Sequence, residues 1–68
     1  MDKLTDTDFE VVLSMADNDM NPTRTANKMF MNRNTVIYHI RKVKKLTGLD
    51  ARNFYDLIKL VRMARSRG

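Results

Sequence analysis

The stretch that decides the fold runs from residue 21 to residue 46 and reads NPTRTANKMFMNRNTVIYHIRKVKKL. It carries seven basic residues and contains neither Asp nor Glu. Its first two residues, Asn21 and Pro22, are typical of a helix start: Asn caps free backbone amides, and Pro lacks an amide that would be unsatisfied there. The sequence therefore predicts a short helix over residues 22–29. The residues expected on its inward side are Ala26, Met29 and Phe30.

A second, longer helix is predicted after a corner at residues 30–32. Asn32 is a good N-cap with Thr35 at the third helical position, and Gly48 is suited to end the helix. Between them, apolar residues recur at helical spacing, which predicts a helix over residues 33–47 with one buried side. The residues expected on that side are Val36, Ile40, Val43 and Leu46, with Ile37 at its margin.

Two further helices are predicted, one on each side of this pair. Thr5 and Asp8 have the spacing of a capping box, which predicts a helix over residues 6–17. Asn53 has the pattern of another N-cap, which predicts a helix over residues 54–64. The core residues expected in the first are Phe9, Val12, Leu13 and Ala16. Those expected in the second are Phe54, Leu57, Ile58, Val61 and Ala64, with Leu60 and Met63 beside them.

The predicted fold class is all-α, as a single four-helix domain over residues 1–68, because no segment shows strand-like alternation. The absence of Cys and the lone His argue against disulfides and a structural zinc site, so no metal or cofactor is expected. No apolar run approaches the roughly 18 residues of a membrane span. The absence of Cys also fits a protein of the reducing cytoplasm. No enzyme is expected, because there is no Ser-His-Asp spacing and no Gly-rich phosphate loop.

Charge is distributed unevenly along the chain. The formal net charge is −5 over residues 1–20, +7 over residues 21–47 and +3 over residues 48–68. This asymmetry suggests one surface that faces a polyanion and another, on the acidic helix 6–17, that points away from it. The charge alone is also compatible with a merely soluble basic surface, since many small domains are basic.

A short helix, a corner and a longer basic helix form the pattern of a helix-turn-helix, whose second helix enters the major groove of DNA. Arg can pair bidentately with guanine and Asn with adenine, while Tyr and His offer a hydrogen bond and a flat apolar face. The residues expected to contact bases are Arg33, Asn34, Tyr38 and His39. Cations farther along the helix, and the N-terminus of the preceding one, suit phosphates. The residues expected there are Thr23, Arg24, Thr25, Arg41, Lys42 and Lys45.

These residues also have plainer interpretations. The lysines can form a solvated face, His39 can be an ordinary surface residue, and Tyr38 can pack on a partner chain. Asn32 is a helix cap whether or not it also contacts DNA, and Thr35 can serve only the helix start.

The central stretch resembles the C-terminal helix-turn-helix of PucR-type transcriptional regulators. The specific part is Arg33-Asn34-Thr35-Val36, followed by a basic run and Leu46-Thr47-Gly48-Leu49, and the resemblance covers about residues 5–64. A looser similarity extends to the DNA-binding end of the factor for inversion stimulation and of bacterial enhancer-binding activators. The resemblance implies Arg33, Asn34 and Tyr38 as base readers. It implies Asn21, Thr23 and Thr35 as DNA backbone contacts, with Asn32 near both groups.

Two features depart from the family pattern. Phe30 stands where most helix-turn-helix corners have Gly, although the PucR type tolerates a large residue there. Residues 37–39 read Ile-Tyr-His, whereas the family often has a basic residue at the first and third of these positions. PucR-type regulators usually also carry a large N-terminal sensory region.

The leading hypothesis is sequence-specific binding of double-stranded DNA by a bacterial transcription regulator. One alternative is a protein-interaction module, in which the basic helix or the acidic helix 6–17 contacts a polymerase subunit or a sensory domain. A second alternative is sequence-independent binding of nucleoid DNA. A homodimer is left open, because Ile37, Leu60 and Met63 either form a dimer contact or complete the core.

Overall fold

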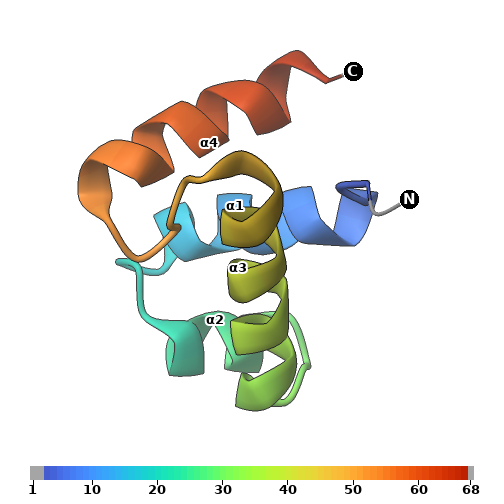
Figure 1. The fold of residues 1–68 in the computed structure, drawn as a ribbon. Coiled ribbons are helices and arrows are strands. Elements are labelled where there is room, and N and C mark those ends of the chain that lie inside the picture. Colours follow the sequence, from blue (N-terminus) through green and yellow to red (C-terminus); the bar gives the residue numbers. More distant parts are fainter. Residues whose placement is uncertain (1–2, 68) are drawn as a thin grey trace.

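The computed structural model describes residues 3–67, and over that range the chain forms four α-helices without strands. They are α1 (Asp6–Asp17), α2 (Pro22–Lys28), α3 (Arg33–Thr47) and α4 (Phe54–Ser66). In Figure 1, α1 lies behind α3, with α4 above and α2 below. The predicted all-α class is confirmed. The bounds of α1 and α3 agree with the prediction, whereas α2 ends one residue earlier and α4 two residues later.

The helix starts form as predicted because side-chain oxygens satisfy the free backbone amides. At α1, the Thr5 hydroxyl accepts from the Asp8 amide at 3.2 Å, and the Asp8 carboxylate accepts from the Thr5 amide at 2.8 Å. At the end of α3, Gly48 adopts a left-handed conformation with φ 77°. The asparagines that cap the other three helices through their side chains are Asn21, Asn32 and Asn53.

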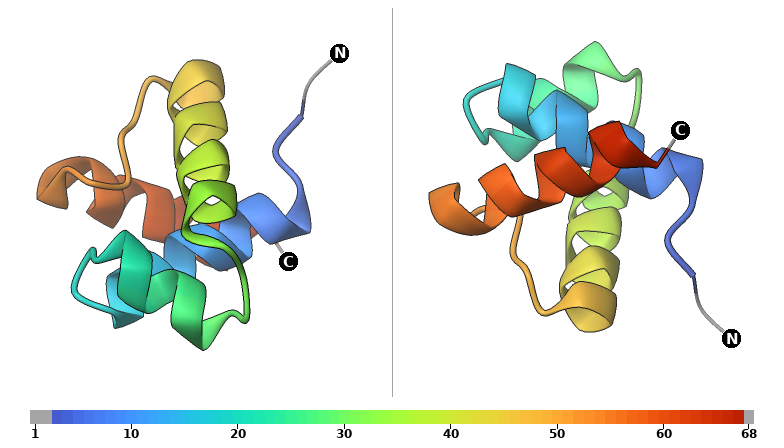
Figure 2. Two further views of the ribbon diagram at one scale, coloured as in Figure 1. Left: turned by 90° about the horizontal axis from the view of Figure 1, so that it is seen from below. Right: turned by 90° about the horizontal axis from the view of Figure 1, so that it is seen from above.

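The core lies where α1 packs against the other three helices, and α4 crosses over α1 when the molecule is seen from above in Figure 2. The predicted buried stripe of α3 is present, except that Leu46 is exposed. Ala26 is buried, which lets α2 approach its neighbours closely. The buried apolar residues of α1, α3 and α4 are Val11, Val12, Met15, Val36, Ile40, Val43, Leu57, Leu60 and Ala64. No helix within residues 3–67 is long and apolar enough to cross a membrane.

The buried side of α1 differs from the predicted one by about one residue. Val11 and Met15 are fully buried, while Phe9 is half-buried and Ala16 is exposed. The prediction gave Asp8 a place in the capping box and an acidic outer face to the helix, but Asp8 is 0% exposed and its charge is paired with Lys42 inside the domain. Because its charge is paired, Asp8 can lie on the side of α1 that faces α3.

The apolar residues of α4 are also arranged differently from the prediction. Leu60, expected beside the core and considered as a dimer contact, is 1% exposed and belongs to the core. Phe54 and Ile58, expected in the core, are 58% and 40% exposed. The side of α4 that carries Leu57, Leu60 and Ala64 packs on the rest of the domain. Phe54 is exposed because α4 crosses α1 and the first turn of α4 extends beyond the end of α1.

The corner between α2 and α3 turns at Phe30, which has a left-handed φ of 55°. The prediction placed this side chain inward, but it is 97% exposed. The Met31 amide donates to the Ala26 carbonyl at 2.9 Å, which closes the reversal of the chain. The left-handed backbone at Phe30 turns its side chain away from the core, so a large side chain fits at this position.

Candidate nucleic-acid interface

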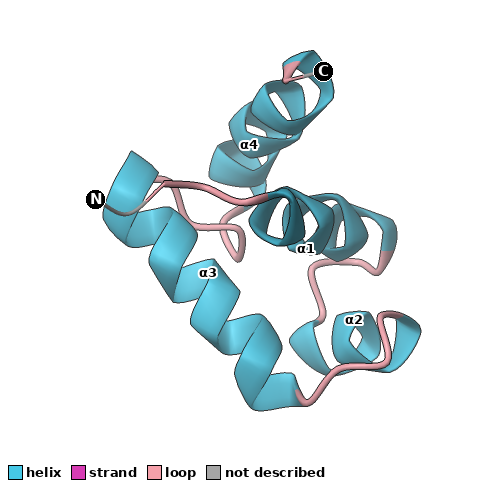
Figure 3. Cartoon of the chain, turned by 90° about the vertical axis from the view of Figure 1, so that its right-hand side faces the viewer, coloured by secondary structure: helices cyan, strands magenta, loops and turns pink. Residues whose placement is uncertain are grey.

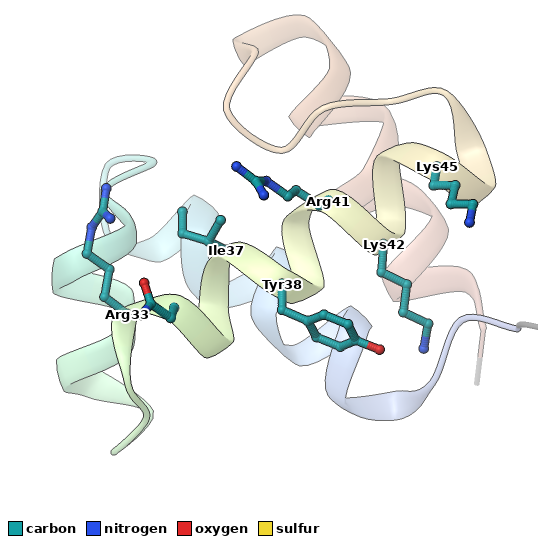
Figure 4. Close-up of a pocket in the computed structure, with 7 residues that line it drawn as sticks. Arg33, Ile37, Tyr38, Arg41, Lys42 and Lys45 are labelled. Carbon is teal, nitrogen blue, oxygen red and sulfur yellow. The ribbon is translucent and has the colours of Figure 1, made fainter.

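The outer side of α3 is free of other helices and lies along one edge of the molecule (Figure 3). The apolar stripe of α3 faces the core and so sets which residues face outward. The side chains drawn in Figure 4 come from one side of this helix and line a shallow hollow. They are Arg33, Asn34, Ile37, Tyr38, Arg41, Lys42 and Lys45. Since residues 21–46 include no acid, this surface is positively charged.

The N-terminal end of α3 is connected to the start of α2 by side chains. Arg33 Nε donates to the Thr23 hydroxyl oxygen at 3.2 Å, so the guanidinium leans towards the first turn of α2. The Asn32 side chain accepts from the Asn34 amide at 2.8 Å, and Asn34 itself is exposed at the helix start. Thr35 is also exposed in this first turn. The two helices of the motif therefore present one continuous polar edge.

The start of α2 contributes the other predicted backbone contacts. The Asn21 side chain accepts from the Arg24 amide at 3.1 Å, and both residues are exposed. Arg24 also forms an exposed ion pair with Asp19 at 3.1 Å. Thr25 was predicted to belong to this surface, but it does not. It is 0% exposed, and its hydroxyl contacts the Met15 sulfur at 3.4 Å.

His39 lies on the inner flank of α3, and its predicted place on the outward side is therefore wrong. Its Nδ1 atom is 2.6 Å from Asp8 Oδ1, and its side chain is only 13% exposed. Lys42 borders the outer hollow, but its Nζ atom lies 2.8 Å from Asp8 Oδ2 and its side chain is 18% exposed. We call Asp8, His39 and Lys42 the Asp8 cluster. It joins α1 to the middle of α3.

The Asp8 carboxyl is ionised at neutral pH. Burial raises its pKa, but hydrogen bonds from Lys42, Thr5 and His39 outweigh this effect and lower the pKa from 3.8 to about 2. Asp8 therefore places a negative charge against α3 and does not belong to the predicted acidic face that points away from nucleic acid. The spacing of His39 and Lys42 puts both on one flank of a helix. The sequence held no signal that an acid 31 residues before His39 would meet both of them.

A second acidic group organises the connection between α3 and α4. Asp50 Oδ1 accepts from the Arg52 amide at 2.8 Å, and Asp56 Oδ2 accepts from the Asp50 amide at 3.1 Å. Burial raises the pKa of Asp50, but hydrogen bonds and charge from Arg52, with Lys44 nearby, lower it overall. These bonds shape the link between α3 and α4 and connect it to the first turn of α4.

Comparison with known proteins agrees with this arrangement. Residues 9–64 match the family of PucR C-terminal helix-turn-helix domains. A segment of 42 residues is 38% identical to the carbohydrate diacid regulator of Escherichia coli (strain K12) and covers 62% of this chain but only 11% of that regulator. No solved structure matches the chain.

The family accounts for the two helices that form the candidate interface. Helix-turn-helix domains of transcription regulators bind DNA, and such a domain family is not an enzyme class. Within residues 3–67, no three His, Cys, Asp or Glu side chains gather as metal ligands would. The chain belongs to the family of PucR C-terminal helix-turn-helix domains.

Proposed function

We propose that this domain binds double-stranded DNA sequence-specifically, with α3 as the recognition helix in the major groove. One observation carries the proposal: an uncovered side of α3 that has Arg33 and Asn34 at its N-terminal end and no acid. The N-terminal residues of a recognition helix are the ones that meet base edges. The proposed site of action is bacterial nucleoid DNA.

The base readers in this proposal are Arg33, Asn34 and Tyr38. Arg33 uses its Nε–H on Thr23, which leaves its other N–H groups for a guanine edge. Asn34 is exposed and suited to adenine. Tyr38 is 60% exposed and offers its hydroxyl together with a flat ring face. Specificity would therefore come from about one and a half turns at the start of α3.

Phosphate contacts are proposed on both sides of this base-reading segment. Arg41 and Lys45 lie farther along the outer side of α3, where cations suit phosphates rather than bases. The start of α2 supplies a hydroxyl and a guanidinium in the same polar edge. The residues proposed there and at the start of α3 are Asn21, Thr23, Arg24, Asn32 and Thr35. We leave out His39 and Lys42, because Asp8 holds both of them.

The test compares alanine substitutions in α3 with one on another helix. Arg33→Ala and Asn34→Ala are each expected to weaken binding to a selected DNA site by about 1–3 kcal/mol and to relax preference at one base position. Arg62→Ala is the matched control, because it removes an exposed positive charge from α4. It is expected to leave both affinity and preference unchanged.

The proposal is overturned if the two α3 variants and the α4 control bind the selected site with the same affinity. Binding of the domain to a purified acidic protein would then be measured, because the basic helix would in that case be expected to contact a protein. Equal affinity of the unmodified domain for selected and random DNA would instead indicate sequence-independent binding.

We also propose that two copies act on a two-fold target when the domain works as a pair. Recognition helices of such pairs enter half-sites about one helical turn, roughly 34 Å, apart. Leu60 is buried and cannot provide the contact, whereas Met63 remains partly exposed on α4. Half-site spacing in selected sequences reports this arrangement directly.

A further inference from the structure

The Asp8 cluster contains the shortest polar contacts between α1 and the proposed recognition helix. Asp8 is 0% exposed, and both of its carboxylate oxygens are used. Oδ1 faces His39 Nδ1 at 2.6 Å, while Oδ2 faces Lys42 Nζ at 2.8 Å and the Thr5 amide at 2.8 Å. The Thr5 bond fixes the carboxylate on the first turn of α1. Two side chains of α3, three residues apart, are thereby fixed to one point.

This arrangement bears on how α3 is oriented. Apolar packing of Val36, Ile40 and Val43 sets the depth of the helix but is non-directional. Hydrogen bonds to charged groups are directional and short. Two of them, from residues about one turn apart on the same flank, limit both the rotation of α3 about its axis and its sliding along α1.

We propose that Asp8 is a positioning residue for DNA recognition: it engages His39 and Lys42 so that they set the orientation of α3 instead of contacting phosphates. The inference rests on the proposed function, since it assigns a role within the same interface. It separates two lysines that look equivalent in the sequence. Lys45 is exposed on the outer side of α3, whereas Lys42 is held against α1.

The experiment compares Lys42→Met with Lys45→Met, each of which removes one charge from the same helix while keeping an unbranched side chain. Binding to a selected duplex and to a random duplex is measured across salt concentrations, at a temperature at which urea titration shows each variant to be folded. Each lost phosphate contact reduces the slope of log K against log salt by about 0.9.

Lys45→Met is expected to weaken both duplexes equally and to reduce the slope by about 0.9. Lys42→Met is expected to leave the slope and the random-duplex affinity unchanged. It is expected to weaken the selected duplex several-fold, because a less constrained α3 presents Arg33 and Asn34 less well. It is also expected to lower Tm by roughly 5 °C, because it removes a partly buried ion pair from a domain of this size.

Asp8→Asn adds a test of the cluster itself. In an Asp8→Asn background, Lys42→Met is expected to cause no further loss of Tm or of selectivity. If Asp8→Asn fails to fold, the comparison of the two lysine variants still decides, because both keep Asp8.

The inference is overturned if Lys42→Met reduces the salt slope as Lys45→Met does, since Lys42 would then contact a phosphate. It is also overturned if Lys42→Met lowers Tm without changing the ratio of selected to random affinity, since the cluster would then be structural only. If Lys45→Met and Arg33→Ala also have no effect on binding, the proposed function itself fails. The two failures are thus distinguishable.

Discussion

At the residue scale, Asp8 is stable in the interior only because each of its oxygens has a charged or hydrogen-bonding partner. Burying a lone carboxylate is costly, and removing one partner of a buried pair leaves that cost uncompensated. His39 and Lys42 are partly exposed, so they can regain water when Asp8 is lost. Loss of Asp8 is therefore expected to weaken mainly the attachment of α1 to α3.

Acid is expected to destabilise the domain through Asp8. Its pKa is about 2 in the folded state against an ordinary value of 3.8, so the unfolded chain takes up a proton first as the pH falls. The stability from this group is present above about pH 4 and is lost as the pH falls from 4 towards 2, by on the order of 2 kcal/mol. Urea unfolding across that pH range measures it.

Asp8→Asn is the control for this prediction. It is expected to flatten the pH dependence in part, because Asp50 also has a lowered pKa and loses stability in the same direction. An Asp8→Asn variant with the same pH dependence as the unmodified domain would contradict the assignment.

The hydrogen on the neutral His39 ring is expected on Nδ1. The ionised Asp8 carboxylate can only accept, and its Oδ1 lies 2.6 Å from Nδ1, so that nitrogen must donate. Imidazole nitrogen chemical shifts, measured by NMR at a pH where the ring is neutral, identify the tautomer. A ring with its hydrogen on Nε2 in the unmodified domain would show that this contact is absent in solution.

At the element scale, helix boundaries were predictable because they depend on neighbouring residues. Thr5, Asn21, Asn32 and Asn53 cap amides two or three positions away, so their effect is visible in the sequence. The faces of α1 and α4 were less predictable because they depend on which helix lies opposite. Leu60 and Met63 look alike in sequence, but only the crossing of α4 over α1 decides which one is buried.

The corner between α2 and α3 is expected to be improved by Phe30→Gly. Phe30 holds a φ of 55° with its side chain almost fully exposed, so it bears the cost of a left-handed conformation without burying its ring. Glycine removes that cost and is expected to raise the free energy of unfolding by roughly 1 kcal/mol. Urea denaturation measures the change.

Phe30→Ala is the matched variant, because it removes the ring but keeps Cβ at the same φ. Its stability is expected to lie close to that of the unmodified domain. If the glycine and alanine variants are equally stable, backbone strain at Phe30 is not the reason for the change.

At the scale of the whole molecule, the structure places α2 and α3 on one side of α1 and leaves the outer side of α3 uncovered. The outward placement of Arg33, Asn34, Tyr38 and Lys45 could be predicted because the apolar stripe of α3 fixes the opposite side. The placement of His39 could not, since its partner comes from another helix. Long-range pairing of charges is what the sequence pattern does not contain.

The salt dependence of DNA binding is a property of the whole interface. Arg24, Arg41 and Lys45 are the cations proposed to meet phosphates, and each is expected to contribute about −0.9 to the slope of log K against log salt. A slope of about −3 is therefore expected for one domain on one site. A slope near zero, measured by titration at several salt concentrations, would show that the basic surface is not the binding surface.

The most direct test of the central claim is selection of bound sites from random duplex DNA, followed by affinity measurement on the enriched site and on a scrambled one. Sequence-specific reading by α3 predicts that the enriched site binds tighter by on the order of a hundredfold. That ratio corresponds to about three base pairs read at roughly 1 kcal/mol each. Equal affinity for the enriched and scrambled duplexes at every salt concentration would contradict it.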